Sequence, residues 1–168
     1  IEHASDKIKE KIIPGMFDFS KFENDKFDLI SFFQTFDHIV EPNKFLQDVR
    51  KILNDKGFVI AINHNIGSIS YKFLKEKSPI IDIGHAYLYD FSTIKKIFEK
   101  NQFRVVKIFP VQNLITLSRL LELLPINDRL KNVLSKIQNG LGIHKIQLPL
   151  YLGNLGIFAR KSDLNMQD

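Results

Sequence analysis

The sequence contains no cysteine among its 168 residues. That absence excludes disulfides, thiolate metal ligands and cysteine nucleophiles, and it fits an intracellular protein. No apolar run approaches the roughly 20 residues that a membrane-spanning helix requires, and no signal peptide is recognisable. We therefore expect a soluble, cytoplasmic protein.

Charge of one sign is not concentrated anywhere in the chain. Lys and Arg number 24 against 19 Asp and Glu, which leaves a formal net charge of +5. The basic residues are scattered over predicted helix faces and turns, a pattern typical of a solvated surface rather than of a nucleic-acid interface. The length suits a single domain, spanning residues 1–168, with a substantial core.

A glycine-rich cofactor loop is also missing from the sequence. No G-x-G-x-x-G run occurs, and that run is the fingerprint of dinucleotide binding. Gly140 and Gly142 form a lone G-x-G that follows no predicted strand, and Gly153 and Gly156 lie near the far end. Neither pair qualifies as a cofactor loop.

A strand, helix and strand occupy the stretch from Lys26 to Asn65. The run Phe27–Phe33 has one charged residue and no strict alternation, which is typical of a strand buried on both faces of a parallel sheet. A turn follows the helix, in which we expect Gly57 to take a positive φ before the next strand, Phe58–Ile62. The helix between them is amphipathic, with one apolar side made of Phe45, Leu46, Val49, Ile52 and Leu53.

The two strands of this unit should be parallel, because the crossover between them is right-handed. In open parallel sheets, ligands bind beyond the carboxyl ends of the strands. The residues of interest are therefore Gln34 to His38 and Asn63 to Asn65.

This stretch resembles the core of class I S-adenosylmethionine-dependent methyltransferases. The matching residues are Phe27, Asp28, Leu29, Ile30, Asp37, His38, Pro42, Phe45, Leu46, Arg50, Leu53 and Gly57. Asp37 stands where the family usually has Glu. The resemblance implies an α/β, Rossmann-like sheet, mostly parallel with an antiparallel last strand, and with helices on both faces. It also implies that the N-terminal strand, its helix and the Gly-rich loop are missing, so that the chain is a fragment.

The resemblance further implies S-adenosyl-L-methionine as the cofactor and a set of residues that bind it. Glu2 matches the acidic residue that accepts hydrogen bonds from the ribose hydroxyls, although a frayed terminal carboxylate is an equal alternative. Phe17 and Asp18 match the loop over the adenine, or else form a plain loop with a buried Phe. Gln34 and His38 would line the cofactor pocket.

Shorter elements are predicted on either side of this unit. Residues 5–11 form a candidate helix and Ile12–Ile13 a brief strand. Ser92 should cap a helix that ends with Asn101 in a left-handed conformation. The strands Phe103–Phe109 and Leu155–Ala159 complete the predicted sheet.

Two segments are candidates for contact with a substrate. Residues 66–89 form a long connection without periodicity at the carboxyl edge of the sheet, and we interpret them as a lid. Residues 111–150 contain two predicted helices, at 114–124 and 130–137, which we interpret as a helical cap. The cap would shape an apolar substrate pocket or make a weak contact with a membrane surface. The alternative is an ordinary helical hairpin on the sheet.

Two of the five histidines are candidates for acid–base chemistry. His64 follows the second strand and His85 precedes the Ser92 helix, and a histidine in either place can accept a proton from a hydroxyl. We assign His85 to the acceptor substrate and His64 to a supporting position near the methyl group. The histidines show no metal-ligand spacing, so no bound metal is expected.

These observations favour methyl transfer from S-adenosylmethionine to a small molecule, with oxygen as the expected acceptor. A catalytically inactive methyltransferase-like binding or partner subunit is the alternative. A nucleotide-binding oxidoreductase is disfavoured, because the chain has neither the nicotinamide fingerprint nor a Tyr-x-x-x-Lys pair.

Overall fold

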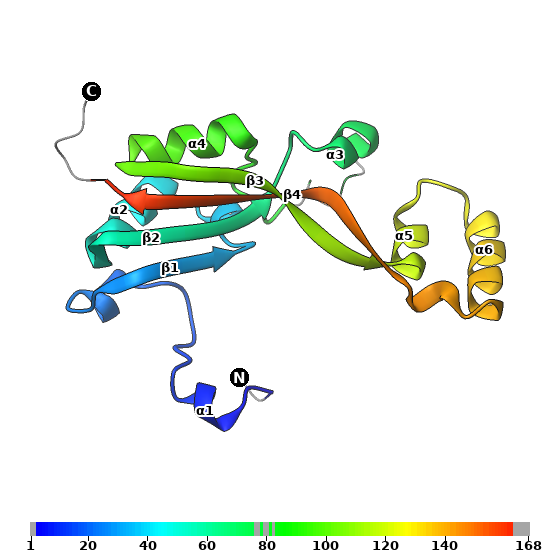
Figure 1. The fold of residues 1–168 in the computed structure, drawn as a ribbon, viewed down its shortest axis with the longest axis horizontal. Helices are drawn as coiled ribbons and strands as arrows, with labels where there is room; N and C mark the ends of the chain where they lie inside the picture. The colour runs from blue at the N-terminus through cyan, green and yellow to red at the C-terminus, as the bar shows by residue number, and fades with distance from the viewer. Residues whose placement is uncertain (1–2, 76–77, 79–80, 82, 163–168) are drawn as a thin grey trace.

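The computed structural model describes residues 3–75, 78, 81 and 83–162, and Figure 1 shows their arrangement. The strands are β1 (Phe27–Phe33), β2 (Leu53–His64), β3 (Phe103–Thr116) and β4 (Gln147–Lys161). The α-helices are α1 (Asp6–Lys9), α2 (Pro42–Ile52), α3 (Ile69–Leu74), α4 (Phe91–Lys100), α5 (Leu117–Leu123) and α6 (Asp128–Gly140). Short 3-10 turns are η1 (Phe19–Phe22), η2 (Phe36–His38) and η4 (Ile143–Lys145). None of the helices in these ranges is long and apolar enough to cross a membrane.

The strands form a single four-stranded sheet in the order β1-β2-β4-β3. β1 and β2 are parallel, with Phe33 opposite Ile62 at their carboxyl ends. β4 is antiparallel to both of its neighbours, β2 and β3. Three strands therefore run in one direction and one in the other, which confirms the predicted α/β sheet with an antiparallel last strand.

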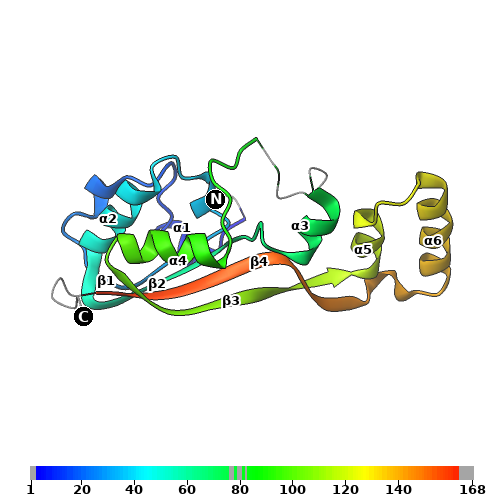
Figure 2. The same ribbon diagram turned by 90° about the horizontal axis from the view of Figure 1, so that it is seen from above.

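Helices α2 and α4 cover one face of this sheet (Figure 2). Leu46 and Val49 of α2 and Ile94 and Phe98 of α4 are buried, as their helical spacing predicted. They pack against alternate residues of the strands, because side chains along a strand point to opposite faces. The strand residues of this core are Phe32, Leu53, Val59, Ala61, Phe103, Leu155, Ile157 and Ala159.

The opposite face of the sheet carries no helix among the described residues, although we expected helices on both faces. β1 lies at the edge of the sheet, and its residues Leu29 and Phe33 are each 55% exposed. The prediction that Phe27–Phe33 is buried on both faces is therefore wrong for the described part of the chain. An apolar run without alternation does not reveal whether a second layer covers it.

Glycine is required at position 57 because a β-carbon would not fit there, not because the backbone has a positive φ. The glycines with positive φ among the described residues are Gly15, Gly142 and Gly153, so the prediction for Gly57 is wrong. A β-carbon on Gly57 would lie 2.9 Å from the carbonyl oxygen of Asn54 and 3.1 Å from that of Phe27. The backbone passes closely here because the pairing of β1 with β2 shifts register beside it.

β3 and β4 continue beyond the sheet as a two-stranded ribbon that carries α5 and α6 at its far end (Figure 1). The pairing extends to Thr116 opposite Gln147, so the ends of the segment 111–150 are strands rather than helices. In particular, Leu114 and Ile115 belong to β3, and their predicted placement in a helix is wrong. α5 and α6 contact each other and η4. The ribbon therefore holds α5 and α6 away from α2 and α4, the helices that cover the sheet.

Four local predictions also differ from the structure. Asp90 rather than Ser92 caps α4, because its carboxylate accepts the backbone N–H of Thr93 at 2.7 Å. Asn101 has a φ of −96°, and the left-handed position falls on Gln102 instead, with φ 62°. The expected helix over residues 5–11 is shortened to α1, and residues 12–13 form no strand.

Candidate functional site

A buried carboxylate, Asp37, lies just beyond the end of β1 and is surrounded by histidines. Its side chain is 1% exposed, and its Oδ2 lies 2.7 Å from Nδ1 of His64. The same oxygen is 3.8 Å from Nε2 of His85, and Oδ1 is 3.9 Å from Nε2 of His38. We call these four residues, Asp37, His38, His64 and His85, the Asp–His cluster.

Hydrogen bonds define the tautomers of two of these histidines. Nδ1 of His38 lies 2.7 Å from the carbonyl oxygen of Gly84. A carbonyl only accepts, so Nδ1 carries a proton, and in the neutral ring Nε2 then turns a lone pair toward Asp37. His64 likewise donates from Nδ1 to the carboxylate, which leaves its Nε2 as the basic nitrogen.

Backbone hydrogen bonds tie the segment that carries His85 to the turn that carries Asp37. The backbone N–H groups of Ala86 and Tyr87 both donate to the carbonyl oxygen of Asp37, at 2.9 and 3.1 Å. The His85 ring lies 4.6 Å from that of His38 and 4.7 Å from that of His64. The cluster is thus fixed by main-chain contacts as well as by its side chains.

Asp37 is ionised in this environment. Burial by itself raises the pKa of its carboxyl, but hydrogen bonds from the ring and the backbone N–H of His64 outweigh that effect, so the pKa lies below its usual value. Oδ1 of Asp37 nevertheless accepts no hydrogen bond from the described residues. Burial raises the pKa of Tyr89 far above its usual value, and the Tyr89 hydroxyl is also buried without a described partner.

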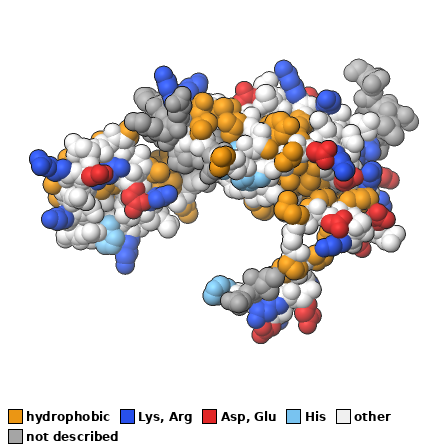
Figure 3. Space-filling view, turned by 180° about the vertical axis from the view of Figure 1, so that it is seen from behind, with side chains coloured by type: hydrophobic (Ala, Val, Ile, Leu, Met, Phe, Trp, Pro, Cys, Tyr) orange, Lys and Arg blue, Asp and Glu red, His pale blue; other side chains and the backbone are white. Residues whose placement is uncertain are grey.

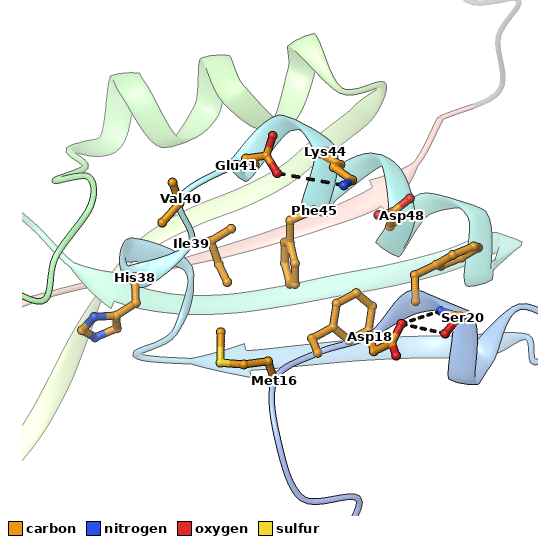
Figure 4. A pocket seen from close by; sticks show the side chains of 12 residues that line it. Met16, Asp18, Ser20, His38, Ile39, Val40, Glu41, Lys44, Phe45 and Asp48 are labelled. Atoms are coloured by element: carbon orange, nitrogen blue, oxygen red, sulfur yellow. Dashed lines mark hydrogen bonds and ion pairs between the residues drawn. The ribbon is translucent and has the colours of Figure 1, made fainter.

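A pocket of about 750 Å³ opens beside the cluster, between the loop of residues 16–20 and α2 (Figure 4). Such a volume is in the range of small-molecule and cofactor sites. His38 lines this pocket and also faces Asp37. The pocket and the Asp–His cluster are therefore adjacent, with His38 between them. Seen from behind, hydrophobic side chains border exposed histidine atoms in the middle of the molecule (Figure 3).

Phe17 and Asp18 both line the pocket, as their predicted cofactor role requires. The ring of Phe17 makes a T-shaped contact with Phe45, with centroids 5.3 Å apart, and stacks on Phe22 at 6.0 Å. The Asp18 carboxylate accepts hydrogen bonds from the backbone N–H and the hydroxyl of Ser20. These bonds lower the pKa of Asp18, the bond from the hydroxyl most of all.

Gln34 stands at the turn after β1 in a conformation that is rare for a residue other than glycine, with φ 50°. Its backbone N–H donates to the carbonyl of Ile62 at 2.7 Å, and its Oε1 is buried without a partner among the described residues. Gln34 does not line the 750 Å³ pocket, so its cofactor role stays a prediction. Glu2 lies outside the described residues.

The structure thus brings His38, His64 and His85 together at one sheet edge, but the residue that joins them was missed. In the sequence, Asp37 was noted only because it and His38 match an acidic residue followed by His in the methyltransferase pattern. Its contact with His64 depends on the adjacency of β1 and β2. The parallel crossover was the one signal in the sequence that pointed to this contact.

The strand order and the strand directions fit a Rossmann-like methyltransferase sheet. The sequence matches a family model described as a methyltransferase domain over residues 3–108. The chain therefore belongs to this methyltransferase family, the S-adenosylmethionine-dependent class that the resemblance indicated. No curated protein matched the sequence.

Solved structures show the same fold. One neighbour, described as a methyltransferase from Bacillus halodurans, has a TM-score of 0.51 at 12% identity, with 83% of this chain and 66% of that chain covered. A SAM-dependent methyltransferase from Archaeoglobus fulgidus has a TM-score of 0.51 at 16% identity, with 85% and 63% covered. A methyltransferase from Haloferax volcanii, in complex with a methyltransferase activator, has a TM-score of 0.55 at 14% identity, with 84% and 57% covered. The chain spans less than two thirds of the length of each of these proteins.

Proposed function

We propose that this chain forms part of a S-adenosylmethionine-dependent methyltransferase that methylates an oxygen atom of a small molecule. The observation that carries the proposal is the adjacency of the 750 Å³ pocket to the Asp–His cluster through His38. A cofactor in the pocket would have basic nitrogens beside it. Such a base assists the removal of a proton from a hydroxyl acceptor.

His64 is the residue that we now assign as proton acceptor. Asp37 holds its Nδ1–H at 2.7 Å, which leaves Nε2 basic and stabilises the imidazolium that forms when Nε2 takes a proton. We expected His85 in this role and His64 in support. The observed hydrogen bond favours the reverse assignment, because the ring of His64 is the one that donates to the carboxylate.

S-adenosylmethionine, when bound, supplies an activated methyl group. The residues of this chain have two tasks toward it. Phe17, Asp18, Gln34 and His38 would hold the cofactor, together with Glu2. His64 Nε2 would take the proton from the hydroxyl of the acceptor substrate.

The lid role of residues 66–89 and the cap role of residues 111–150 remain part of the proposal. Ser78 of the first segment is buried. In the second, Leu130, Val133 and Ile137 of α6 lie on one side of the helix and are 44–50% exposed. Such an apolar side can contact an apolar substrate or, weakly, a membrane surface.

The test is methyl transfer from S-adenosylmethionine labelled in its methyl group. The complete enzyme, of which this chain forms part, is offered matched pairs of small molecules that differ only in a hydroxyl or an amine, and the products are identified by mass spectrometry. We expect label in methyl ethers and formation of S-adenosylhomocysteine. Transfer only to amines would contradict the oxygen assignment. Cofactor binding without transfer to any acceptor would favour the inactive partner subunit.

A further inference from the structure

We propose that the Asp–His cluster binds a divalent transition-metal ion of the zinc type, through Asp37, His38 and His85. This site goes beyond the proposed methyl transfer, and its test does not depend on that function. The spacing of the histidines along the chain predicted no bound metal. Its ligands come from two segments, the turn after β1 and the residues before α4, so no local spacing reveals them.

The first observation is a pair of electron-rich atoms that face each other. Because Nδ1 of His38 donates to Gly84, Nε2 of the neutral ring presents a lone pair. It faces Oδ1 of Asp37 across 3.9 Å, and Oδ1 is buried without a hydrogen-bond partner among the described residues. That distance is too long for a direct hydrogen bond. A cation between the two atoms would satisfy both.

The second observation is the donor set and its size. One ligand atom from each of Asp37, His38 and His85 lies within 4.8 Å of the others. Zinc binds His nitrogen and carboxylate oxygen at about 2.0–2.2 Å, which places tetrahedral ligands roughly 3.3 Å apart. Nε2 of His38 is 3.9 Å from Oδ1 of Asp37, and Nε2 of His85 is 3.8 Å from Oδ2. The three ligand atoms, at most 4.8 Å apart, must therefore move together by roughly an ångström around the ion. Two histidines and a carboxylate also leave a coordination position open.

The third observation is that the ligands are already oriented. A metal-binding histidine commonly donates its other ring N–H to a backbone carbonyl, as His38 does to Gly84. The second oxygen of Asp37 accepts from His64. The side chains of Asp37 and His85 are 1% and 6% exposed, whereas that of His38 is 45% exposed. His38 thus lies where an ion would enter a largely enclosed site.

Calorimetric titration with zinc chloride tests the site, on purified protein without a histidine tag or chelator. We expect one zinc ion per chain, and a loss of affinity of at least about tenfold in His38→Ala and in His85→Ala. His144→Ala is the matched control, because His144 lies in η4 at the far end of the ribbon, and it should bind zinc like the parent. Magnesium chloride should not bind, since magnesium prefers all-oxygen ligands.

Exposure of His38 makes His38→Ala the decisive variant, because its replacement should not disturb the fold. Circular dichroism and a thermal melt check this, and His38→Ala decides the outcome if His85→Ala unfolds. Unaltered zinc affinity in a folded His38→Ala protein would overturn the proposal. Absence of a single-site isotherm in the parent protein, or loss of binding in His144→Ala, would overturn it equally.

Discussion

His64 and Asp37 are joined by a hydrogen bond of 2.7 Å between the ring Nδ1 and the carboxylate, although they are far apart in sequence. The bond follows from the parallel pairing of β1 and β2, which places the end of each strand at the same sheet edge. His64 is the last residue of β2, and Asp37 lies in the turn after β1. One strand pairing therefore builds the pair of residues on which the proposed chemistry depends.

Replacement of His64 by alanine should lower methyl transfer by roughly a hundredfold or more, as expected for the loss of a general base. Both effects refer to the complete enzyme, whose cofactor affinity should change little because His64 does not line the 750 Å³ pocket. Turnover with a confirmed hydroxyl acceptor and calorimetry with the cofactor check the two expectations. His144→Ala serves as the control. If His64→Ala retains full turnover, either another base acts or positioning alone suffices.

Much of the fold was predictable because the helices and strands around the sheet have strong local patterns. The spacing of Leu46 and Val49 on α2 correctly indicated their burial. The edge position of β1 was not predictable, because burial depends on neighbours that an apolar run does not specify. The ribbon was missed for a related reason: Leu114 and Ile115 precede α5 without a break, so the boundary between strand and helix is not marked by Gly or Pro.

The candidate site was predictable only in outline. Strand ends located His38 and His64 at the same edge, since both follow predicted parallel strands. The position of His85 depends instead on backbone bonds from Ala86 and Tyr87 to Asp37. Such long-range main-chain contacts have no pattern in the sequence, and neither do the buried, unsatisfied oxygens of Gln34 and Asp37.

Gly57→Ala should destabilise the protein by roughly 1–3 kcal/mol, the range for forcing an extra carbon into a packed place. The new β-carbon would meet two backbone oxygens, at 2.9 and 3.1 Å, and backbone atoms cannot rotate away. Gly140→Ala is the matched control, because nothing lies within 4 Å of its β-carbon position and alanine favours a helix. Urea denaturation of both variants measures the difference. Equal stability of the two would contradict the close approach at Gly57.

The 168-residue chain should bind S-adenosylmethionine weakly. A Gly-rich loop before a helix supplies backbone donors and close approach to such cofactors, and no such loop occurs in this sequence. Calorimetry should show no binding at micromolar concentrations. Micromolar binding that is lost in Phe17→Ala would instead mean that the pocket beside α2 is sufficient for the cofactor.

Asp90 should stabilise the protein in a manner that depends on pH. Its carboxylate accepts the Thr93 backbone N–H at 2.7 Å and the Thr93 hydroxyl at 2.8 Å, and Thr93 in turn accepts the backbone N–H of Asp90. The backbone bond from Thr93, followed by the bond from its hydroxyl, lowers the pKa of Asp90 below the usual value of 3.8. A lowered pKa in the folded state means that the added stability is present above the unfolded-state pKa and disappears as the pH falls through the folded-state pKa.

Two substitutions at Asp90 distinguish the stabilisation by its capping hydrogen bond from the stabilisation by its negative charge. Asp90→Ala should cost about 1 kcal/mol at neutral pH, because α4 loses its N-cap. Asp90→Asn keeps an oxygen that accepts the Thr93 N–H, so it should cost less. Since the parent loses its ionised carboxylate in acid and Asp90→Asn never has one, the gap in unfolding free energy between these two proteins should shrink from pH 7 toward pH 3. Urea denaturation across this range measures the gap, with Ser92→Ala as the control on the same helix. If this difference in unfolding free energy stays constant with pH, the charge of Asp90 contributes nothing to stability. If Ser92→Ala is destabilised, Ser92 rather than Asp90 caps α4.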